Sequence, residues 1–200
     1  MSKKSTLSHK LVGTWLTILG SLGMLASVTL LHDVIELAKN PSFVPICSIN
    51  PILSCTSVMA SAQAEVFGIP NPVFGVIAFT MLITFGILLA AKTTFTRWIW
   101  GAALAAGVMG VIFAHWLFFQ SMFVLGTICP WCSLVWVITI AIFWLLVSYV
   151  LDHELFGTAK KLTVMRSIWR RCRIAVLVAW YLLLIVIIFV RFNDYWMSLL

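Results

Sequence analysis

The chain has 200 residues, of which 62% are hydrophobic and only 10% are charged. This composition excludes a water-soluble domain, because too little polar surface is available to face water. The formal net charge of +7 does not indicate nucleic-acid binding, because most basic residues stand beside apolar runs, where they set membrane topology and meet anionic lipid headgroups.

Five apolar runs are each long enough to cross about 30 Å of hydrocarbon as helices that rise about 1.5 Å per residue. They lack the alternating pattern of barrel strands, and a helix satisfies its own backbone polar groups within lipid. The sequence therefore predicts an all-α integral membrane protein with a single domain over 1–200. The predicted spans are 11–32, 73–91, 98–119, 131–151 and 174–192.

Basic residues predict the orientation of these helices. Eleven of them fall on one side of the membrane and two, Lys39 and Arg191, fall on the other. The N-terminus is therefore expected in the cytoplasm and the C-terminus outside. The first run is too long for a signal-peptide core and should remain as an anchor. The eleven residues are Lys3, Lys4, Lys10, Lys92, Arg97, Lys160, Lys161, Arg166, Arg170, Arg171 and Arg173.

The segment 33–72 is the long outer loop of this topology. It holds five of the six prolines, among them Pro51, and these should stiffen it. Ser54 is a suitable N-cap for a short helix at the membrane surface, which Gly68 would close. Asp33 is expected to mark the solvated end of the first helix. On the inner side, the basic segment 152–173 is expected to be an amphipathic connector that contacts headgroups.

Four of the five cysteines are placed outside the membrane, Cys47 and Cys55 in the loop and Cys129 and Cys132 at the start of the fourth span. Disulfides persist in oxidising compartments and not in the cytosol, so two exchangeable pairs are expected there. Cys172 falls at the cytoplasmic face and is expected to remain a thiol.

The motif Cys129-Pro130-Trp131-Cys132 opens the fourth span. Cβ atoms three residues apart on a helix are separated by about 5–6 Å, whereas a disulfide prefers about 3.8 Å. A bridge between Cys129 and Cys132 would therefore be strained and easily reduced, which is typical of a catalytic disulfide. The helix N-terminus also favours a thiolate, and Pro130 suits the first helical position.

Two inert roles are alternatives for these cysteines. A structural bridge across two intervening residues removes little chain entropy and therefore stabilises little. Zinc binding by all four cysteines fits poorly with the seven-residue gap between Cys47 and Cys55, because zinc motifs usually leave about two to four.

The favoured hypothesis is a relay in which the loop pair exchanges with a soluble partner and then with the CxxC pair near lipid. The electrons must then leave the protein. The sequence has no haem-type CxxCH, flavin motif or nucleotide-binding loop, so a lipid-soluble two-electron acceptor is the simplest expectation.

The cysteines and their surroundings resemble the bacterial form of the vitamin K epoxide reductase family. The likeness extends over roughly 11–192 and implies a four-helix bundle around a quinone, with a fifth helix outside it, in the bacterial cytoplasmic membrane. The matching segments are Cys47, Ser54-Cys55, Ser61, Phe67-Gly68, Asn71-Pro72-Val73-Phe74-Gly75 and Cys129-Pro130-Trp131-Cys132.

The resemblance also implies a direction of electron flow. Electrons would pass from a thioredoxin-fold partner through the loop cysteines to Cys129 and then to Cys132, which would face the quinone. Many bacterial relatives carry a thioredoxin-like domain after the fifth helix, whereas this sequence runs to Leu200 without one. We therefore expect the partner to be a separate DsbA-like protein.

Four further residues are expected at the quinone, which would be of the menaquinone, ubiquinone or vitamin K type. The resemblance implies that the Asn71 amide hydrogen-bonds a quinone carbonyl, with Ser61 and Phe74 nearby. Trp136 stands where animal members have a tyrosine, and its indole N–H could donate in place of the phenol.

Two other functions stay open. The same site would serve if reduction of vitamin K epoxide or quinone were the main purpose, and a non-enzymatic scaffold or channel would use the cysteines as structural bridges. The sequence leaves undecided which of Cys47 and Cys55 meets the partner first, and whether His115, near the outer end of the third span, handles protons.

Overall fold

A computed structural model describes residues 7–50, 52–66, 68–153, 155 and 160–198, of which 160–162 and 198 are described by their backbone alone. The chain divides into two compact units, Met1–Leu155 and Phe156–Leu200, and each is described by itself. Several predictions fall outside the described residues, namely those on Lys3, Lys4, Pro51, Phe67 and Leu200 and on the side chains of Lys160 and Lys161.

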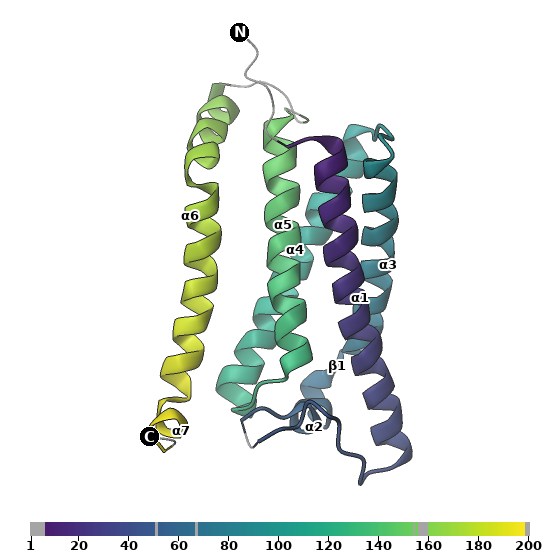
Figure 1. The fold of residues 1–200 in the computed structure, drawn as a ribbon, viewed down its shortest axis with the longest axis vertical. Helices are drawn as coiled ribbons and strands as arrows, with labels where there is room; N and C mark the ends of the chain where they lie inside the picture. The colour runs from purple at the N-terminus through teal and green to yellow at the C-terminus, as the bar shows by residue number, and fades with distance from the viewer. Residues whose placement is uncertain (1–6, 51, 67, 154, 156–159, 199–200) are drawn as a thin grey trace. The chain divides into compact units, whose positions relative to one another are not determined.

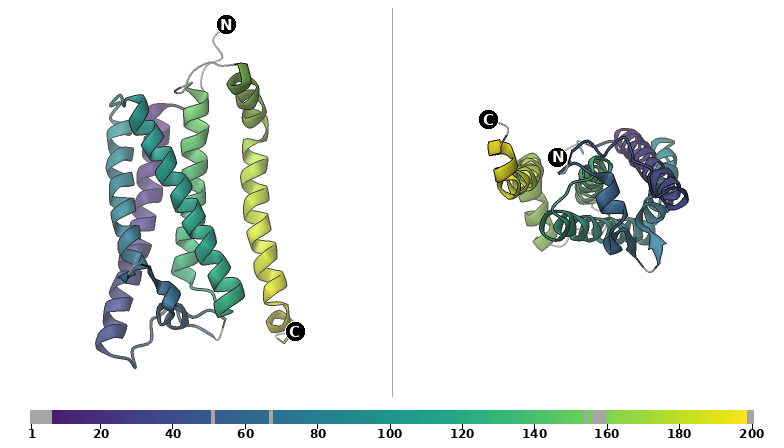
Figure 2. Two further views of the ribbon diagram at one scale, coloured as in Figure 1. Left: turned by 180° about the vertical axis from the view of Figure 1, so that it is seen from behind. Right: turned by 90° about the horizontal axis from the view of Figure 1, so that it is seen from below.

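The first unit is a bundle of four long helices, drawn in Figures 1 and 2. These are α1 (His9–Lys39), α3 (Asn71–Ala90), α4 (Arg97–Phe119) and α5 (Pro130–Asp152). α1 packs against α3 and α5, and α4 packs against α5. The second unit contains α6 (Lys160–Arg191) and α7 (Asn193–Ser198).

The described residues contain five helices that are long and apolar enough to cross a membrane. The prediction of an all-α membrane protein with five spans is therefore confirmed. Two helices run beyond the predicted spans, because hydropathy marks the lipid boundary and not the end of the hydrogen-bonded helix. α1 continues to Lys39, which pairs with Glu36 at 2.8 Å, and α6 already begins at Lys160 within the predicted connector.

The loop between α1 and α3 contains short elements. α2 (Cys55–Met59) begins after Ser54, whose hydroxyl accepts a hydrogen bond from the Ser57 N–H at 3.2 Å, so the predicted N-cap is confirmed. The predicted end at Gly68 is wrong, because α2 is followed by a short 3₁₀ helix (η1, Ala62–Ala64) and by strands β1 (Glu65–Val66) and β2 (Ile69–Pro70). Gly68 has a φ of +73° and serves the turn of this hairpin, where the left-handed conformation favours glycine.

α1 and α3 approach each other closely through glycines. A Cβ atom at Gly13 would lie 2.6 Å from the carbonyl oxygen of Gly86, and one at Gly86 would lie 2.7 Å from the Thr17 hydroxyl. Small residues at helix crossings allow backbones to meet in membrane proteins, where lipid tails leave little hydrophobic force to join helices. This contact fixes the position of α3 relative to α1.

Replacement of Gly13 by alanine should therefore destabilise the bundle. We expect Gly13→Ala to lower the free energy of unfolding by about 1–3 kcal/mol, because the added methyl group meets backbone atoms that cannot move alone. Thermal unfolding in detergent measures this effect. Gly101→Ala is the matched control, because a Cβ atom at Gly101 in α4 meets nothing within 4 Å, and equal unfolding temperatures for both variants would contradict the close approach.

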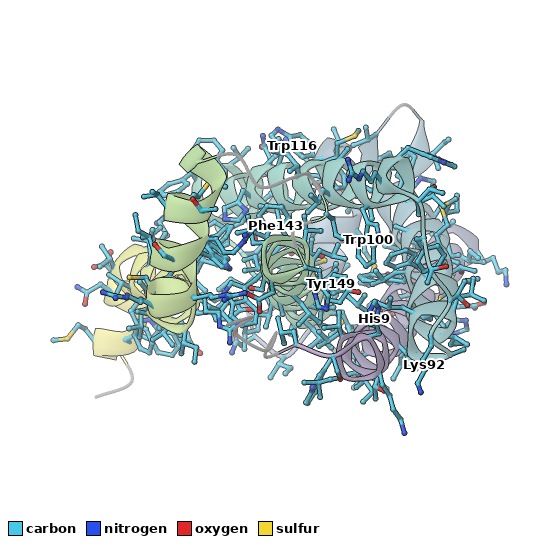
Figure 3. All side chains as sticks on the ribbon, turned by 90° about the horizontal axis from the view of Figure 1, so that it is seen from above. His9, Lys92, Trp100, Trp116, Phe143 and Tyr149 are labelled. Atoms are coloured by element: carbon cyan, nitrogen blue, oxygen red, sulfur yellow. A yellow bond between two sulfur atoms is a disulfide. The ribbon has the colours of Figure 1, made fainter. Side chains whose placement is uncertain are left out.

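One end of the bundle is held by an aromatic cluster from three helices. Tyr149 of α5 is fully buried, stacks on Trp100 of α4 with 4.6 Å between ring centroids, and forms a 2.6 Å hydrogen bond with Nδ1 of His9 in α1. Figure 3 shows these three side chains gathered at this end. Cys129 and Cys132, described below, lie at the opposite end of α5, where the helix begins.

Candidate active site

The loop cysteines form a disulfide in the structure. Cys47 and Cys55 are bonded, and Cys55 is the first residue of α2. Cys55 is completely buried, whereas Ile46, the neighbour of Cys47, is 99% exposed. Cys47 is 7% exposed and belongs to the same buried cluster as Cys55, so both sulfur atoms of the loop pair are buried and Cys47 is the one beside an exposed residue.

The CxxC motif begins α5, as the sequence predicts. Pro130 occupies the first turn, and Cys129 is the N-cap, with its sulfur accepting a hydrogen bond from the Cys132 backbone N–H at 3.3 Å. Cys129 and Cys132 are free thiols. A disulfide was expected as a possible state of both pairs, and the structure has it in the loop pair and thiols in the motif, so the two pairs are in complementary redox states.

The two pairs meet through Cys55 and Cys129. Their sulfur atoms are 3.3 Å apart, although 74 residues separate them in the sequence. Leu30 of α1 lies in the same buried cluster, against which Trp131 and Cys132 pack. A sulfur from each pair is thus in van der Waals contact inside a buried apolar cluster, which is the arrangement that thiol–disulfide exchange requires.

Backbone pairing explains this contact. Leu53 and Ile128 form an isolated parallel β-bridge, in which the Ile128 N–H donates to the Ile52 carbonyl at 2.7 Å and the Ser54 N–H donates to the Ile128 carbonyl at 3.0 Å. Cys129 directly follows Ile128, and Cys55 stands two residues after Leu53, so the bridge brings the two cysteines together. Figure 1 shows α2 at the end of the bundle where α5 begins.

No sequence pattern singles out Ile52, Leu53, Thr127 or Ile128. Two residues of pairing fall below any strand pattern, and only the hydrogen bonds between distant segments reveal them. The prediction that Asp33 marks the solvated end of the first helix is wrong, because the side chain is buried, with 8% exposure. The continuation of α1 to Lys39 explains the error, since Asp33 lies within the helix, one turn after Leu30.

The surroundings of Cys129 favour its thiolate. Hydrogen bonds from the Cys132 thiol, the largest cause, and from the backbone N–H groups of Cys132 and Trp131 lower the pKa of Cys129, while burial and the negative charge of Asp33 act in the opposite direction. The N–H groups of the helix N-terminus thus contribute to lowering the pKa of Cys129, as the sequence predicts, but the Cys132 thiol contributes more.

Loss of the Cys132 thiol should raise the pKa of Cys129. We expect the pH midpoint for alkylation of Cys129 by a small neutral reagent to move to higher pH in Cys132→Ala, because the largest stabilising hydrogen bond is removed while the backbone N–H donors stay. Cys132→Ser, which retains a hydroxyl donor, should keep the midpoint near that of the wild type. An unchanged midpoint in Cys132→Ala would show that this hydrogen bond does not control the thiolate.

Two of the four residues expected at a quinone have buried polar atoms without a hydrogen-bond partner among the described residues. They are Oδ1 of Asn71, at the start of α3, and Nε1 of Trp136, in α5. The Asn71 amide nitrogen donates to the Gln63 carbonyl at 2.7 Å, which fixes the amide. Orphaned polar atoms in a protein interior are costly and need an explanation, such as a ligand.

The other two residues have different surroundings. The Ser61 hydroxyl donates to the Val58 carbonyl at 2.6 Å, so it satisfies the end of α2. Phe74 is half-buried in the first turns of α3. His115, in α4, has its Nδ1 2.8 Å from the Val111 carbonyl of its own helix. Asn71 and Trp136 therefore have polar atoms available for a ligand, whereas the Ser61 hydroxyl already has a partner.

The chain also matches a family model. The model is described as the Vitamin K epoxide reductase family, and the match covers residues 14–147, which include both cysteine pairs. Enzymes of this family are quinone-linked thiol oxidoreductases, and a buried contact between two cysteine pairs serves that chemistry. Since the match covers more than half of the chain, the protein belongs to the vitamin K epoxide reductase family.

Proposed function

We propose that this membrane protein oxidises the thiols of a soluble partner and passes the two electrons to a quinone, with a disulfide as the product. The observation that carries the proposal is the 3.3 Å contact between the sulfur atoms of Cys55 and Cys129, which joins the two pairs. Structural bridges alone would not require a second, reduced pair against the first.

The first step takes place at the loop pair. A thiolate of the partner attacks Cys47 of the Cys47–Cys55 disulfide, Cys55 leaves as a thiolate, and the second partner thiol releases the partner with its own disulfide. Cys47 is the site of attack because it is the less buried of the two, 7% exposed beside the 99% exposed Ile46, whereas Cys55 is 0% exposed and lies against Cys129. The loop pair is then a dithiol.

The second step transfers the electrons inward. The Cys55 thiolate attacks Cys129 of the Cys129–Cys132 disulfide and Cys132 leaves. The Cys47 thiolate then attacks Cys55, restores the loop disulfide and releases Cys129 as a thiolate. The result is a loop disulfide beside two motif thiols, which is the redox state of the described structure.

In the last step, which closes the cycle, the Cys129 and Cys132 thiols would form their disulfide and release two electrons and two protons, which a quinone held at this site would accept to become a quinol. The Trp136 indole N–H is a free donor for a quinone carbonyl, and the Asn71 Oδ1 is a free acceptor for a quinol hydroxyl, so these residues fit both forms.

Loss of the indole N–H should weaken quinone binding. We expect Trp136→Phe to raise the KM for quinone about 3- to 10-fold with a smaller change in kcat, because one hydrogen bond contributes about 0.5–1.5 kcal/mol. Trp98→Phe is the control, because Trp98 in α4 is 73% exposed. Equal KM values for Trp136→Phe and the wild type would remove Trp136 from the quinone site.

The partner in this proposal is a separate thioredoxin-fold protein of the DsbA type, outside the bacterial cytoplasmic membrane. The excess of basic residues on one side supports a cytoplasmic N-terminus and an external cysteine site, where disulfides persist. Menaquinone, ubiquinone and vitamin K share the carbonyl chemistry that Trp136 would recognise.

The proposal is tested with the purified protein in detergent. A reduced DsbA-like protein and each of the three quinones are added, and quinone absorbance and partner thiols are followed together. We expect one partner disulfide for each quinone consumed. A partner that stays reduced in the presence of every quinone would contradict the proposed function.

A further inference from the structure

We propose that Thr127 is a positioning residue for electron transfer, because its hydroxyl holds the segment before Cys55 against the segment before Cys129. The inference rests on the proposed function and adds to it a residue that touches no reacting sulfur. Thr127 Oγ1 donates to the Ile52 carbonyl at 2.9 Å, which joins residues 75 positions apart.

Thr127 is well placed to act as a clamp. It is 3% exposed, and the Ile52 carbonyl that it binds also accepts the Ile128 N–H at 2.7 Å. Two donors from consecutive residues therefore converge on one oxygen, and they fix both the distance and the register of the two segments. Without the Thr127 hydroxyl, only the backbone hydrogen bonds of the β-bridge would hold this register.

The other side of Thr127 is fixed by Ser121. The Ser121 hydroxyl donates to the Thr127 carbonyl, and the Thr127 N–H donates to the Ser121 carbonyl at 3.2 Å. Ser121 is 3% exposed and lies in η2, the π-helix Gln120–Leu125 that continues α4. Gly126 then takes a φ of +64° and turns the chain back toward α5. Thr127 thus connects the loop to a transmembrane helix.

The hydrogen-bonded residues Thr127 and Ile52 lie close in the sequence to Cys129 and Cys55. Ile52 precedes Cys55 by three residues, and Thr127 precedes Cys129 by two. A small slip between the two segments would therefore change the 3.3 Å sulfur separation. Reaction rates respond steeply to such changes, and a misplacement of about 1 Å can cost about 100-fold.

Several hydroxyls of the described residues donate to a carbonyl of their own helix. Thr139, for example, donates to the Val135 carbonyl of its own helix at 2.7 Å. Replacement of Thr139 by valine removes a hydroxyl from α5 without loosening the contact between the loop and the motif. It is therefore the matched control for the same change at Thr127.

The test measures sulfur proximity without a quinone or a partner. In a Cys47→Ala/Cys132→Ala background, Cys55 and Cys129 keep their positions and a mild thiol oxidant can join them to each other. The rate of this crosslink is followed on non-reducing gels, and its position is mapped by mass spectrometry. We expect Thr127→Val to slow the crosslink at least about 10-fold. Thr127→Ser, which retains the hydroxyl, should restore the rate, and Thr139→Val should leave it unchanged.

Two results would overturn the inference: an unchanged crosslink rate in Thr127→Val, or an equally slow rate in Thr127→Ser. If Thr127→Val does not fold, Ser121→Ala replaces it, since it removes the hydrogen bond to the Thr127 carbonyl and should also slow the crosslink. The proposed function is judged separately, by partner oxidation in the otherwise unchanged protein. A slowed crosslink in a protein that oxidises no partner would sustain the clamp and reject the function.

Discussion

Cys132→Ala is expected to abolish quinone consumption, with a loss of at least about 1,000-fold in the rate with a reduced partner. Without Cys132 the motif cannot form its disulfide, so no electron pair reaches the quinone. The measurement is quinone absorbance with purified protein and a reduced DsbA-like partner. Cys129→Ala should be equally inactive, because Cys129 is the sulfur that contacts the loop pair.

Cys172→Ala is the control for this prediction. Cys172 is an exposed thiol of α6, outside the region matched to the family and outside both cysteine pairs. Its loss should leave the rate unchanged. Normal turnover in Cys132→Ala would reject the relay.

Cys55→Ala and Cys47→Ala are expected to differ in how they trap the partner. In Cys55→Ala, Cys47 can attack an oxidised partner, and the mixed disulfide accumulates because Cys55 is absent to resolve it. In Cys47→Ala, little mixed disulfide should form, because Cys55 is completely buried and faces Cys129. A difference of about 10-fold or more in trapped partner is expected from this contrast in access.

Non-reducing electrophoresis followed by peptide mapping measures the trapped species. The partner should be a variant that lacks its second cysteine and carries thionitrobenzoate on the remaining one. The thiolate of the membrane protein attacks this activated disulfide, thionitrobenzoate leaves, and the mixed disulfide persists because the partner has no second thiol. A larger amount of trapped partner on Cys55 in Cys47→Ala would reverse the proposed order of the loop cysteines.

The membrane helices follow from the sequence because length and apolar composition are sufficient to predict them. The start of α5 is equally predictable from the sequence, since Pro130 and the cysteine before it are local signals for a helix N-terminus. The end of α2 is not, because a left-handed glycine terminates helices and also forms hairpin turns. Gly68 does the second, and nothing near it in the sequence separates the two uses.

The candidate site was predictable as a set of cysteines but not as a geometry. Each pair is recognisable from spacing and compartment, whereas the contact of Cys55 with Cys129 depends on a bridge between two short segments far apart in the chain. Thr127 carries no signal of its own, because a threonine in a turn is common and its partner is a backbone carbonyl. The burial of Asp33 is not predictable in this way, because the apolar run marks the lipid-crossing part of α1 and not the end of the helix at Lys39.

The proposed function depends most directly on the passage of electrons between the two cysteine pairs through Cys129. The decisive measurement starts from fully reduced protein, adds quinone, quenches with acid at successive times and maps each disulfide by mass-tagged alkylation. We expect the Cys129–Cys132 disulfide to appear first and the Cys47–Cys55 disulfide to follow. In Cys132→Ala, the loop disulfide should not form. Formation of Cys47–Cys55 at the wild-type rate in Cys132→Ala would show that the quinone oxidises the loop without the motif, and would contradict the relay.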